Sequence, residues 1–200
     1  MGAPRLQLRA RPRDDHGESA KALASALLQA APDAEGYGAD HALAVAALSR
    51  PVGMELGLDE EALEDLESAA LLHDLGKVGM LKAILRKAAP LTREEARIIK
   101  AHPQRGARMV EPWPCLGGAV RAIEHHHERY DWGGYPEGLA GEQIPLAARI
   151  VAVADAYDVL VSGRPYQTAR PPTEAIGRLF AEAGGQFDAR VVAALARVVI

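Results

Sequence analysis

The chain has 200 residues, 48% of them hydrophobic, which is enough for one globular domain with a single core. Its net charge of −4 argues against binding to nucleic-acid polymers, which require a basic surface. The single cysteine, Cys115, excludes an internal disulfide framework and favours a reducing, cytoplasmic location. We expect no membrane segment, because no apolar run reaches about 18 residues and the N-terminus lacks the apolar core of a secretory signal.

The first part of the chain predicts three helices. Residues 18–30 carry alanine and leucine at helical spacing, and the following stretch, 31–40, contains the Pro, Gly and Asp residues of a break. The apolar spacing resumes over His41–Leu56, with a bend expected at Pro51. Asp59 is the expected N-cap of a third helix, which carries a continuous apolar stripe.

The second part of the chain is also predominantly helical in its pattern. Thr92, followed by Glu95, predicts a capping box and a helix that runs toward His102. The stretch 130–145 is too rich in Gly and Pro for a helix. Further helices are expected at residues 117–128, 146–162, 173–182 and 188–199. The expected fold class is therefore all-α.

The stretch AALLHDLGKVG places polar groups at the end of an apolar helix. His73 and Asp74 follow an alanine- and leucine-rich run directly, and Lys77 comes three residues after Asp74. Burying an unpaired polar group costs several kcal/mol. Lys77 shares the face of the other two side chains if the helical turn continues. Either these groups pair with one another, or a partner outside the chain, such as a metal ion, pairs with them.

A similar problem arises at Asp155, which interrupts the apolar run RIVAVADAYDVLV. Arg149 lies off its helical face, and Asp158, one turn later, repels it unless a cation neutralises the two carboxylates. Imidazole and carboxylate together suit Mn, Fe, Co or Zn. A carboxylate beside a histidine can bridge two metals about 3.5–4 Å apart, a pair that activates water and stabilises charge on a phosphoryl group.

Apart from Asp155, each candidate ligand also has an ordinary structural explanation. The His73–Asp74 pair could form a loop cap at the helix C-terminus, and His41 could be a simple core or surface histidine. His102 could end a helix, because a proline follows it. The three consecutive histidines 125–127 could form a solvated face, since neighbours on a helix diverge by about 100°.

Five motifs in order nevertheless resemble one family, the HD-GYP phosphodiesterases of the HD metal-hydrolase superfamily. The motifs are HDLGK, HPQRG, HHERYDWGGYPEGLAGEQIPLAARIVAVADAYD, RPY and GGQFD. This resemblance implies that residues 37–200 form an HD-domain helical bundle, which includes a GYP loop. Residues 1–36 are then an N-terminal extension with one helix.

The resemblance implies a site with two divalent metal ions, for which Fe or Mn are the expected elements. Residues that match the ligands of one metal are His41, His73, Asp74 and Asp155. Those that match the ligands of the other metal are Asp74, His102, His126 and His127, with Asp74 bridging. His125 is expected to be a neighbour of the site. Tyr37 stands where some members have an acidic ligand for a third metal, so only two metals are expected.

By the same resemblance the chain is expected to hydrolyse cyclic di-GMP to linear pGpG, with GMP as a possible second product. Asp74 and Lys77 are the expected catalytic residues. Lys77 also matches a residue that reaches the scissile phosphate, and Arg164 matches an arginine that binds the other phosphate. Gly134, Tyr135 and Pro136 are expected to shape the loop at the substrate mouth.

Two departures from the family pattern leave substrate preference open. Trp132 stands in a glycine position, where its indole could narrow the mouth or stack on a base, and Gln167 replaces a basic residue. The alternatives are a non-catalytic cyclic-dinucleotide receptor and a phosphodiesterase that prefers the mixed cyclic GMP-AMP. A docking module that binds a diguanylate synthase (GGDEF-type) domain through the GYP loop is another, and the apolar N-terminal helix could form a homodimer.

Overall fold

The computed structural model describes residues 14–30, 39–85, 87, 89–163 and 168–200. The α-helices are α1 (Asp14–Ala30), α2 (Ala39–Glu55), α3 (Glu60–Leu72), α4 (Lys82–Leu85), α5 (Arg93–Lys100), α6 (His102–Val110), α7 (Val120–His125), α8 (Leu146–Ser162), α9 (Pro172–Ala181) and α10 (Ala189–Val199). Three 3-10 turns, η1 (Leu75–Lys77), η2 (Pro114–Ala119) and η3 (Gly141–Gln143), connect some of them. The described residues form no strands, only two isolated β-bridges, so the predicted all-α fold is confirmed.

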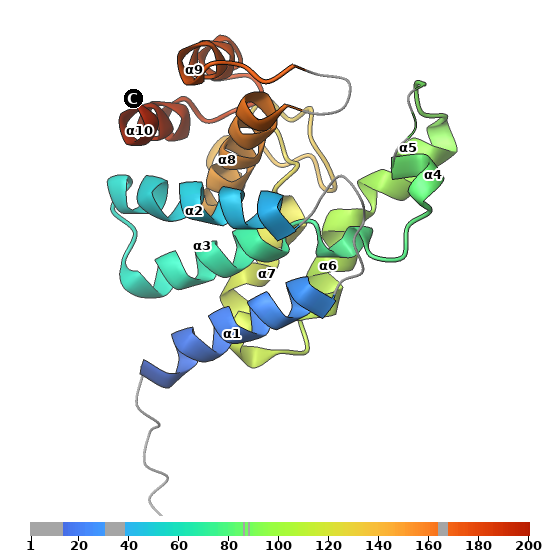
Figure 1. The fold of residues 1–200 in the computed structure, drawn as a ribbon, viewed down its shortest axis with the longest axis vertical. Helices are drawn as coiled ribbons and strands as arrows, with labels where there is room; N and C mark the ends of the chain where they lie inside the picture. Colours follow the sequence, from blue (N-terminus) through green and yellow to red (C-terminus); the bar gives the residue numbers. More distant parts are fainter. Residues whose placement is uncertain (1–13, 31–38, 86, 88, 164–167) are drawn as a thin grey trace, which may run out of the picture.

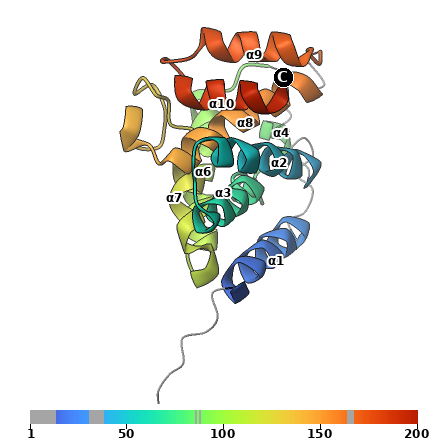
Figure 2. The same cartoon turned by 90° about the vertical axis from the view of Figure 1, so that its left-hand side faces the viewer.

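The helices α2, α3 and α8 form the centre of the bundle (Figure 1). Their contact faces are fully buried at Val45, Leu66 and Val151, which places the apolar core between them. Helix α1 lies along α3 in both views and buries Ala20 and Ala24 (Figures 1 and 2). Helices α9 and α10 pack together at the C-terminal end. No helix in the described ranges has the length and hydropathy to cross a membrane.

The helix starts follow the capping signals of the sequence. The Asp59 carboxylate accepts a hydrogen bond of 3.0 Å from the backbone nitrogen of Ala62 at the start of α3. Thr92 and Glu95 form the predicted capping box before α5. Helix α2 continues through Pro51 to Glu55. The predicted boundary between residues 36 and 37 lies outside the described residues and stays a prediction.

Two predicted helices differ from those found. The helix from Thr92 ends at Lys100, and His102 begins α6, so the explanation of His102 as a helix end is wrong; the proline after it is tolerated in the first turn. The helix predicted over 117–128 begins as the 3-10 turn η2 and ends at His125. The chain then turns, and the backbone nitrogen of Glu128 donates to the carbonyl of His125.

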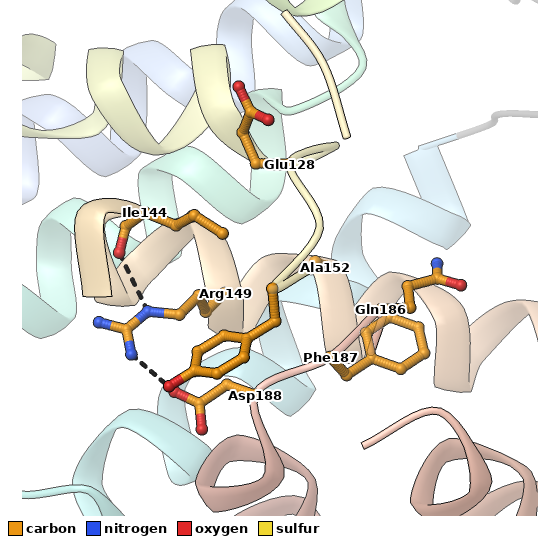
Figure 3. A pocket seen from close by; sticks show the side chains of 8 residues that line it. Glu128, Ile144, Arg149, Ala152, Gln186, Phe187 and Asp188 are labelled. Carbon is orange, nitrogen blue, oxygen red and sulfur yellow. Dashed lines mark hydrogen bonds and ion pairs between the residues drawn. The ribbon is translucent and has the colours of Figure 1, made fainter. Parts of the chain in front are cut away.

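A buried ion pair connects the end of the GYP loop to the C-terminal helices. The Arg149 guanidinium donates to the Asp188 carboxylate at 2.6 Å and to the backbone oxygen of Ile144 at 3.0 Å (Figure 3). Asp188 also caps α10 by accepting from the backbone nitrogen of Arg190. Both side chains of the pair are at least nine-tenths buried. Arg149, which the sequence placed off the face of Asp155, thus has a partner of its own.

Candidate metal centre

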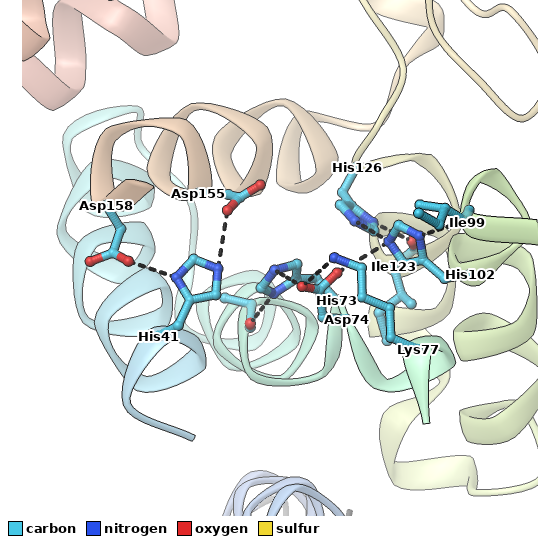
Figure 4. A network of polar contacts seen from close by, with 11 residues as sticks. His41, His73, Asp74, Lys77, Ile99, His102, Ile123, His126, Asp155 and Asp158 are labelled. Atoms are coloured by element: carbon cyan, nitrogen blue, oxygen red, sulfur yellow. Dashed lines mark hydrogen bonds and ion pairs between the residues drawn. The ribbon is translucent and has the colours of Figure 1, made fainter. Parts of the chain in front are cut away.

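The seven predicted metal ligands lie together at the centre of the bundle, in two groups. The first group consists of His41, His73 and Asp155, and the second of Asp74, His102, His126 and His127. Within each group the candidate ligand atoms all lie within 4.8 Å of one another. They converge from α2, the end of α3, α6, the turn after α7, and α8 (Figure 4). Each group has the size and the nitrogen and oxygen donors to hold one metal ion.

The Asp74 carboxylate lies between the two groups. Its Oδ2 atom is 3.5 Å from Nε2 of His73, and its Oδ1 atom is 3.1 Å from Nε2 of His102. One oxygen therefore faces each group (Figure 4). This is the arrangement that a carboxylate bridging two metals requires.

Three histidines of the cluster are oriented by the same backbone contact. Each Nδ1 atom lies at hydrogen-bond distance from the carbonyl three residues earlier: 2.8 Å for His73 to Ala70, 2.8 Å for His102 to Ile99, and 2.7 Å for His126 to Ile123. A carbonyl only accepts, so each Nδ1 carries a proton and donates it. In the neutral imidazole the lone pair is then on Nε2, which points into the cluster.

These orientations leave polar atoms in the cluster that the protein does not satisfy. The Nε2 atoms of His102 and His126 face each other at 3.2 Å. Because both Nδ1 atoms are donors, two lone pairs meet there unless a cation or an additional proton separates them. Nε2 of His73 and Oδ1 of Asp74 are buried without a hydrogen bond from any described residue. The donor set therefore fits bound metal ions.

The protonation states in the second group also suit metal binding. Burial, assisted by the imidazole of His127, lowers the pKa of His126 well below its usual value. Burial and the neighbouring His102 lower the pKa of His127 to about 3. Burial alone raises the pKa of Asp74, but Lys77 and His73 more than offset it and hold that pKa well below its usual value. All three side chains are consequently in the deprotonated form that binds metals.

His41 lies between two carboxylates of α8. Its Nδ1 atom is 2.6 Å from Oδ2 of Asp158, and its Nε2 atom is 3.1 Å from Oδ1 of Asp155. Burial lowers the pKa of His41, but the hydrogen bonds that the imidazole donates to both carboxylates raise it to about 9. The imidazole thus separates the two acidic groups whose repulsion the sequence indicated.

Asp158 was not among the predicted site residues. Its second oxygen accepts from Oγ of Ser162 at 3.0 Å, so the carboxylate is fixed while it holds Nδ1 of His41. A histidine ligand is commonly oriented by a carboxylate in this way. In the sequence, the position of Asp158 three residues after Asp155 was the available indication that it belongs to the site. What the sequence could not show is the contact with His41, which lies 117 residues away.

Lys77 and Gly76 belong to the 3-10 turn η1 that follows Asp74. The Lys77 ammonium donates to Oδ2 of Asp74 at 2.7 Å, and its side chain is 7% exposed. A Cβ atom on Gly76 would lie 2.0 Å from the backbone oxygen of His102 and 2.6 Å from the nitrogen of Gly106. Only glycine lets η1 lie this close to α6, and this contact keeps Asp74 beside His102.

The GYP loop lies against the second group of ligands. The ring of Tyr135 stacks on His127 with centroids 5.0 Å apart, and the ammonium of Lys100 lies 5.2 Å from the Tyr135 ring. Trp132 has φ of 69° and is 72% exposed. This left-handed conformation favours glycine and costs a tryptophan of the order of 1 kcal/mol or more, in keeping with the glycine that the family resemblance implies at this position.

Some of the remaining predicted residues are buried near the site, and others lie outside the described residues. His125 and His126 are each only 1% exposed, so the explanation of the three histidines as a solvated face is wrong. His125 belongs to neither ligand group. Tyr37, Arg164 and Gln167 lie outside the described residues, and their roles stay predictions.

Comparison with known proteins places the chain in a family. The family model described as HD domain matches residues 17–191. The chain belongs to the HD domain family. HD domain phosphohydrolases are metal-dependent, and the cluster described above is able to bind metal.

Relatives of this HD domain protein have closely similar sequences. It is 46% identical over 149 residues to the cyclic di-GMP phosphodiesterase response regulator RpfG of Xanthomonas campestris, covering 73% of this chain and 39% of that protein. It is 41% identical over 162 residues to a cyclic di-GMP phosphodiesterase of Pseudomonas aeruginosa, covering 80% of this chain and 38% of the relative. These matches confirm the resemblance to HD-GYP phosphodiesterases. The chain spans about two fifths of the length of each relative.

A solved structure supports the fold. The crystal structure of a cyclic GMP-AMP specific phosphodiesterase of Vibrio cholerae superimposes with a TM-score of 0.68 at 21% identity. The match covers 92% of this chain and 48% of that one. The helical bundle of this chain therefore has the same fold as that structure.

Proposed function

We propose that the chain is a metal-dependent phosphodiesterase that hydrolyses cyclic di-GMP to pGpG, with GMP as the product of a second hydrolysis. The observation that carries this proposal is the pair of ligand groups that share the Asp74 carboxylate. The two relatives named as cyclic di-GMP phosphodiesterases support the choice of substrate. The resemblance of the HDLGK and GYP motifs to those of HD-GYP phosphodiesterases supports this substrate as well.

The proposed centre holds two divalent ions, Fe or Mn. His41, His73 and Asp155 hold one ion, His102, His126 and His127 hold the other, and Asp74 bridges them. Such a pair supplies an activated water near neutral pH and offsets the negative charge of a phosphodiester. The protein orients three of the imidazoles through the backbone carbonyls described above. Their Nε2 atoms therefore point into the site before any ion binds.

Lys77 is the proposed catalytic cation. Its ammonium is buried at the edge of the cluster, 2.7 Å from the oxygen of Asp74. At this position it stabilises negative charge that develops on the scissile phosphate, or protonates the leaving 3′ oxygen. Arg164 is proposed to bind the second phosphate through its planar guanidinium. Gly134, Tyr135 and Pro136 form the loop at the mouth of the site.

The test compares the parent chain with the Asp74→Ala variant. Each protein is loaded anaerobically with Fe(II) or with Mn(II) and incubated with cyclic di-GMP or with cyclic GMP-AMP, and the products are separated by chromatography. We expect pGpG from cyclic di-GMP with the parent only. Tight binding of cyclic di-GMP without cleavage under either metal would contradict the proposal and indicate a receptor. Cleavage of cyclic GMP-AMP alone would correct the substrate.

A GGDEF-type synthase partner at the GYP loop, a homodimer through the N-terminal helix and a cytoplasmic location stay predictions. The apolar face of α1 is already used within the chain, where Ala20 and Ala24 lie buried in the core beside α3. A homodimer through α1 therefore has to use its outer face. Size-exclusion chromatography with light scattering tests this directly.

A further inference from the structure

Glu128 is a buried acid that follows the ligands His126 and His127 directly in the chain. Its side chain has no exposed surface. A carboxylate in such a place is costly unless donors satisfy it. Its Oε1 atom accepts two backbone hydrogen bonds, from the nitrogen of Glu137 at 2.7 Å and from that of Gly138 at 3.1 Å. Both donors belong to the segment immediately after the GYP motif.

The same stretch of loop lies against the backbone on either side of Glu128. A Cβ atom on Gly134 would lie 2.2 Å from the nitrogen of Arg129 and 2.5 Å from Cα of Glu128, so the two backbones are in direct contact. Tyr135 donates its backbone N–H to the carbonyl of His127 at 3.2 Å. The loop is therefore attached to the ligand segment at three successive points.

Tyr135 connects the attached loop to His127, a ligand of the proposed second metal. Its ring stacks on the imidazole of His127 with an angle of 27° between the planes. For the other histidines of the second group, His102 and His126, a backbone carbonyl fixes Nδ1. For His127 the described contacts are the Tyr135 stack and neighbouring imidazoles. The orientation of His127 thus depends on the position of the loop.

We propose that Glu128 is a positioning residue for the second metal. It holds the loop segment Tyr135–Gly138 against the ligand segment, and the loop holds the imidazole of His127 in its ligating orientation through Tyr135. Glu128 touches neither metal nor substrate. The inference rests on the metal centre of the proposed function, and it assigns to the GYP motif a role in building that centre in addition to its place at the substrate mouth.

The test compares three variants. Glu128→Ala removes the acceptor of both loop hydrogen bonds, whereas Glu128→Gln keeps a carbonyl oxygen for them, removes the charge and replaces Oε2, which has no hydrogen bond from any described residue, by an amide group. Glu137→Ala is the matched control, because it deletes an exposed carboxylate of the same loop and leaves its backbone donor in place. Two quantities are measured: Mn(II) binding by calorimetric titration, and amide hydrogen exchange of Tyr135, Glu137 and Gly138 in the metal-free protein.

With Glu128→Ala we expect one Mn(II) equivalent to keep the parent affinity and the other to weaken by about 10–100-fold, the usual effect of removing a support of a metal ligand. The three loop amides should exchange faster. Glu128→Gln and Glu137→Ala should both behave like the parent. Parent-like binding and exchange in Glu128→Ala would overturn the proposal, and so would an equal loss of both equivalents, which indicates a general structural defect.

The exchange measurement separates this inference from the proposed function. If the parent binds no Mn(II), the proposed metal centre fails, while unchanged loop exchange in Glu128→Ala would still overturn the role of Glu128. If the parent binds two equivalents but cleaves no cyclic dinucleotide, the proposed reaction fails, and the loss of one equivalent in Glu128→Ala still supports the role in positioning.

Discussion

Two groups of buried charged side chains each include a residue of α8, Arg149 in one and Asp155 in the other, and the groups differ in how their polar atoms are satisfied. Arg149 and Asp188 pair with each other, and their remaining hydrogen bonds go to Ile144 and to the start of α10. In the histidine and aspartate cluster, Nε2 atoms face one another, and buried atoms of His73 and Asp74 have no hydrogen bond from any described residue. The first group is satisfied within the protein, whereas the second leaves buried polar atoms that bound metal would satisfy.

Mutations in the two groups should have different effects, mainly on stability in the first group and mainly on function in the second. Removing one partner of a complete buried pair leaves an uncompensated charge and destabilises the fold. Removing one member of an incomplete cluster removes a ligand and also relieves repulsion, so function suffers while stability changes little. Four predictions test this difference, in order of decreasing expected effect.

The largest effect is expected for His126→Asn. The asparagine amide can replace Nδ1 as the donor to the carbonyl of Ile123, but it removes the Nε2 atom that faces His102 at 3.2 Å. We expect hydrolysis to fall by about 10³-fold, which corresponds to about 4 kcal/mol. The unfolding temperature of the metal-free protein should change by no more than about 4 °C, which corresponds to about 1 kcal/mol. Kinetics and calorimetry measure the two effects, and a large loss of stability would contradict the distinction.

Asp188→Ala should show the opposite pattern. It leaves Arg149 buried without its partner, and such losses cost about 3–5 kcal/mol, or about 6–20 °C in unfolding temperature. Mn(II) binding by the folded protein should not change. Glu142→Ala is the control, because its pair with Arg190 is exposed and should contribute less than about 1 kcal/mol. Equal stability of the two variants would show that the buried pair does not hold the C-terminal helices.

Asp158→Ala should weaken the binding of one metal ion and leave the affinity for the other unchanged. It removes the carboxylate that holds Nδ1 of His41 at 2.6 Å, so the affinity of the first group should fall by about 10–100-fold. Ser162→Ala, which removes only the outer support of Asp158, should have a smaller effect in the same direction. Calorimetric titration with Mn(II) distinguishes the two sites. Loss of the equivalent that Glu128→Ala also loses would place the two positioning residues at one metal and contradict this assignment.

The smallest effect is a dependence of stability on pH. Burial raises the pKa of Asp188, but the hydrogen bonds from the backbone of Arg190 and from Arg149 hold it below its usual value. A carboxyl with a lowered folded pKa stabilises the fold above its unfolded pKa of about 3.9, and this contribution is lost as the pH falls through the folded pKa. The stability gap between parent and Asp188→Ala should therefore narrow below about pH 4 in urea denaturation. A gap that is constant down to pH 3 would mean that the charge of Asp188 does not contribute.

The sequence predicted the features that depend on near neighbours. The caps at Asp59 and Thr92 depend on residues three positions away and were found as expected. The break before His102 was not foreseen, because a proline after a histidine suits the first turn of a new helix as well as the end of an old one. The three-histidine stretch was ambiguous because helical spacing does not show where a short helix ends.

The site itself was predicted mainly through its resemblance to a family. The HDLGK and HHE motifs place their ligands by local spacing, and the structure brings the seven residues together. The residues that the sequence analysis missed act through contacts between distant segments. Asp158 reaches His41 in another helix, and Glu128 reaches the loop after the GYP motif. Periodicity contains no information on which distant side chain a buried carboxylate meets.

Locating bound metal in the cluster tests the proposed centre most directly. Crystals of the protein soaked in Mn(II) are measured at a wavelength where manganese scatters anomalously. We expect two anomalous peaks in the cluster, about 3.5–4 Å apart, on either side of the Asp74 carboxylate. Crystals with no peak beside Asp74, and with the Nε2 atoms of His102 and His126 still facing each other, would contradict it.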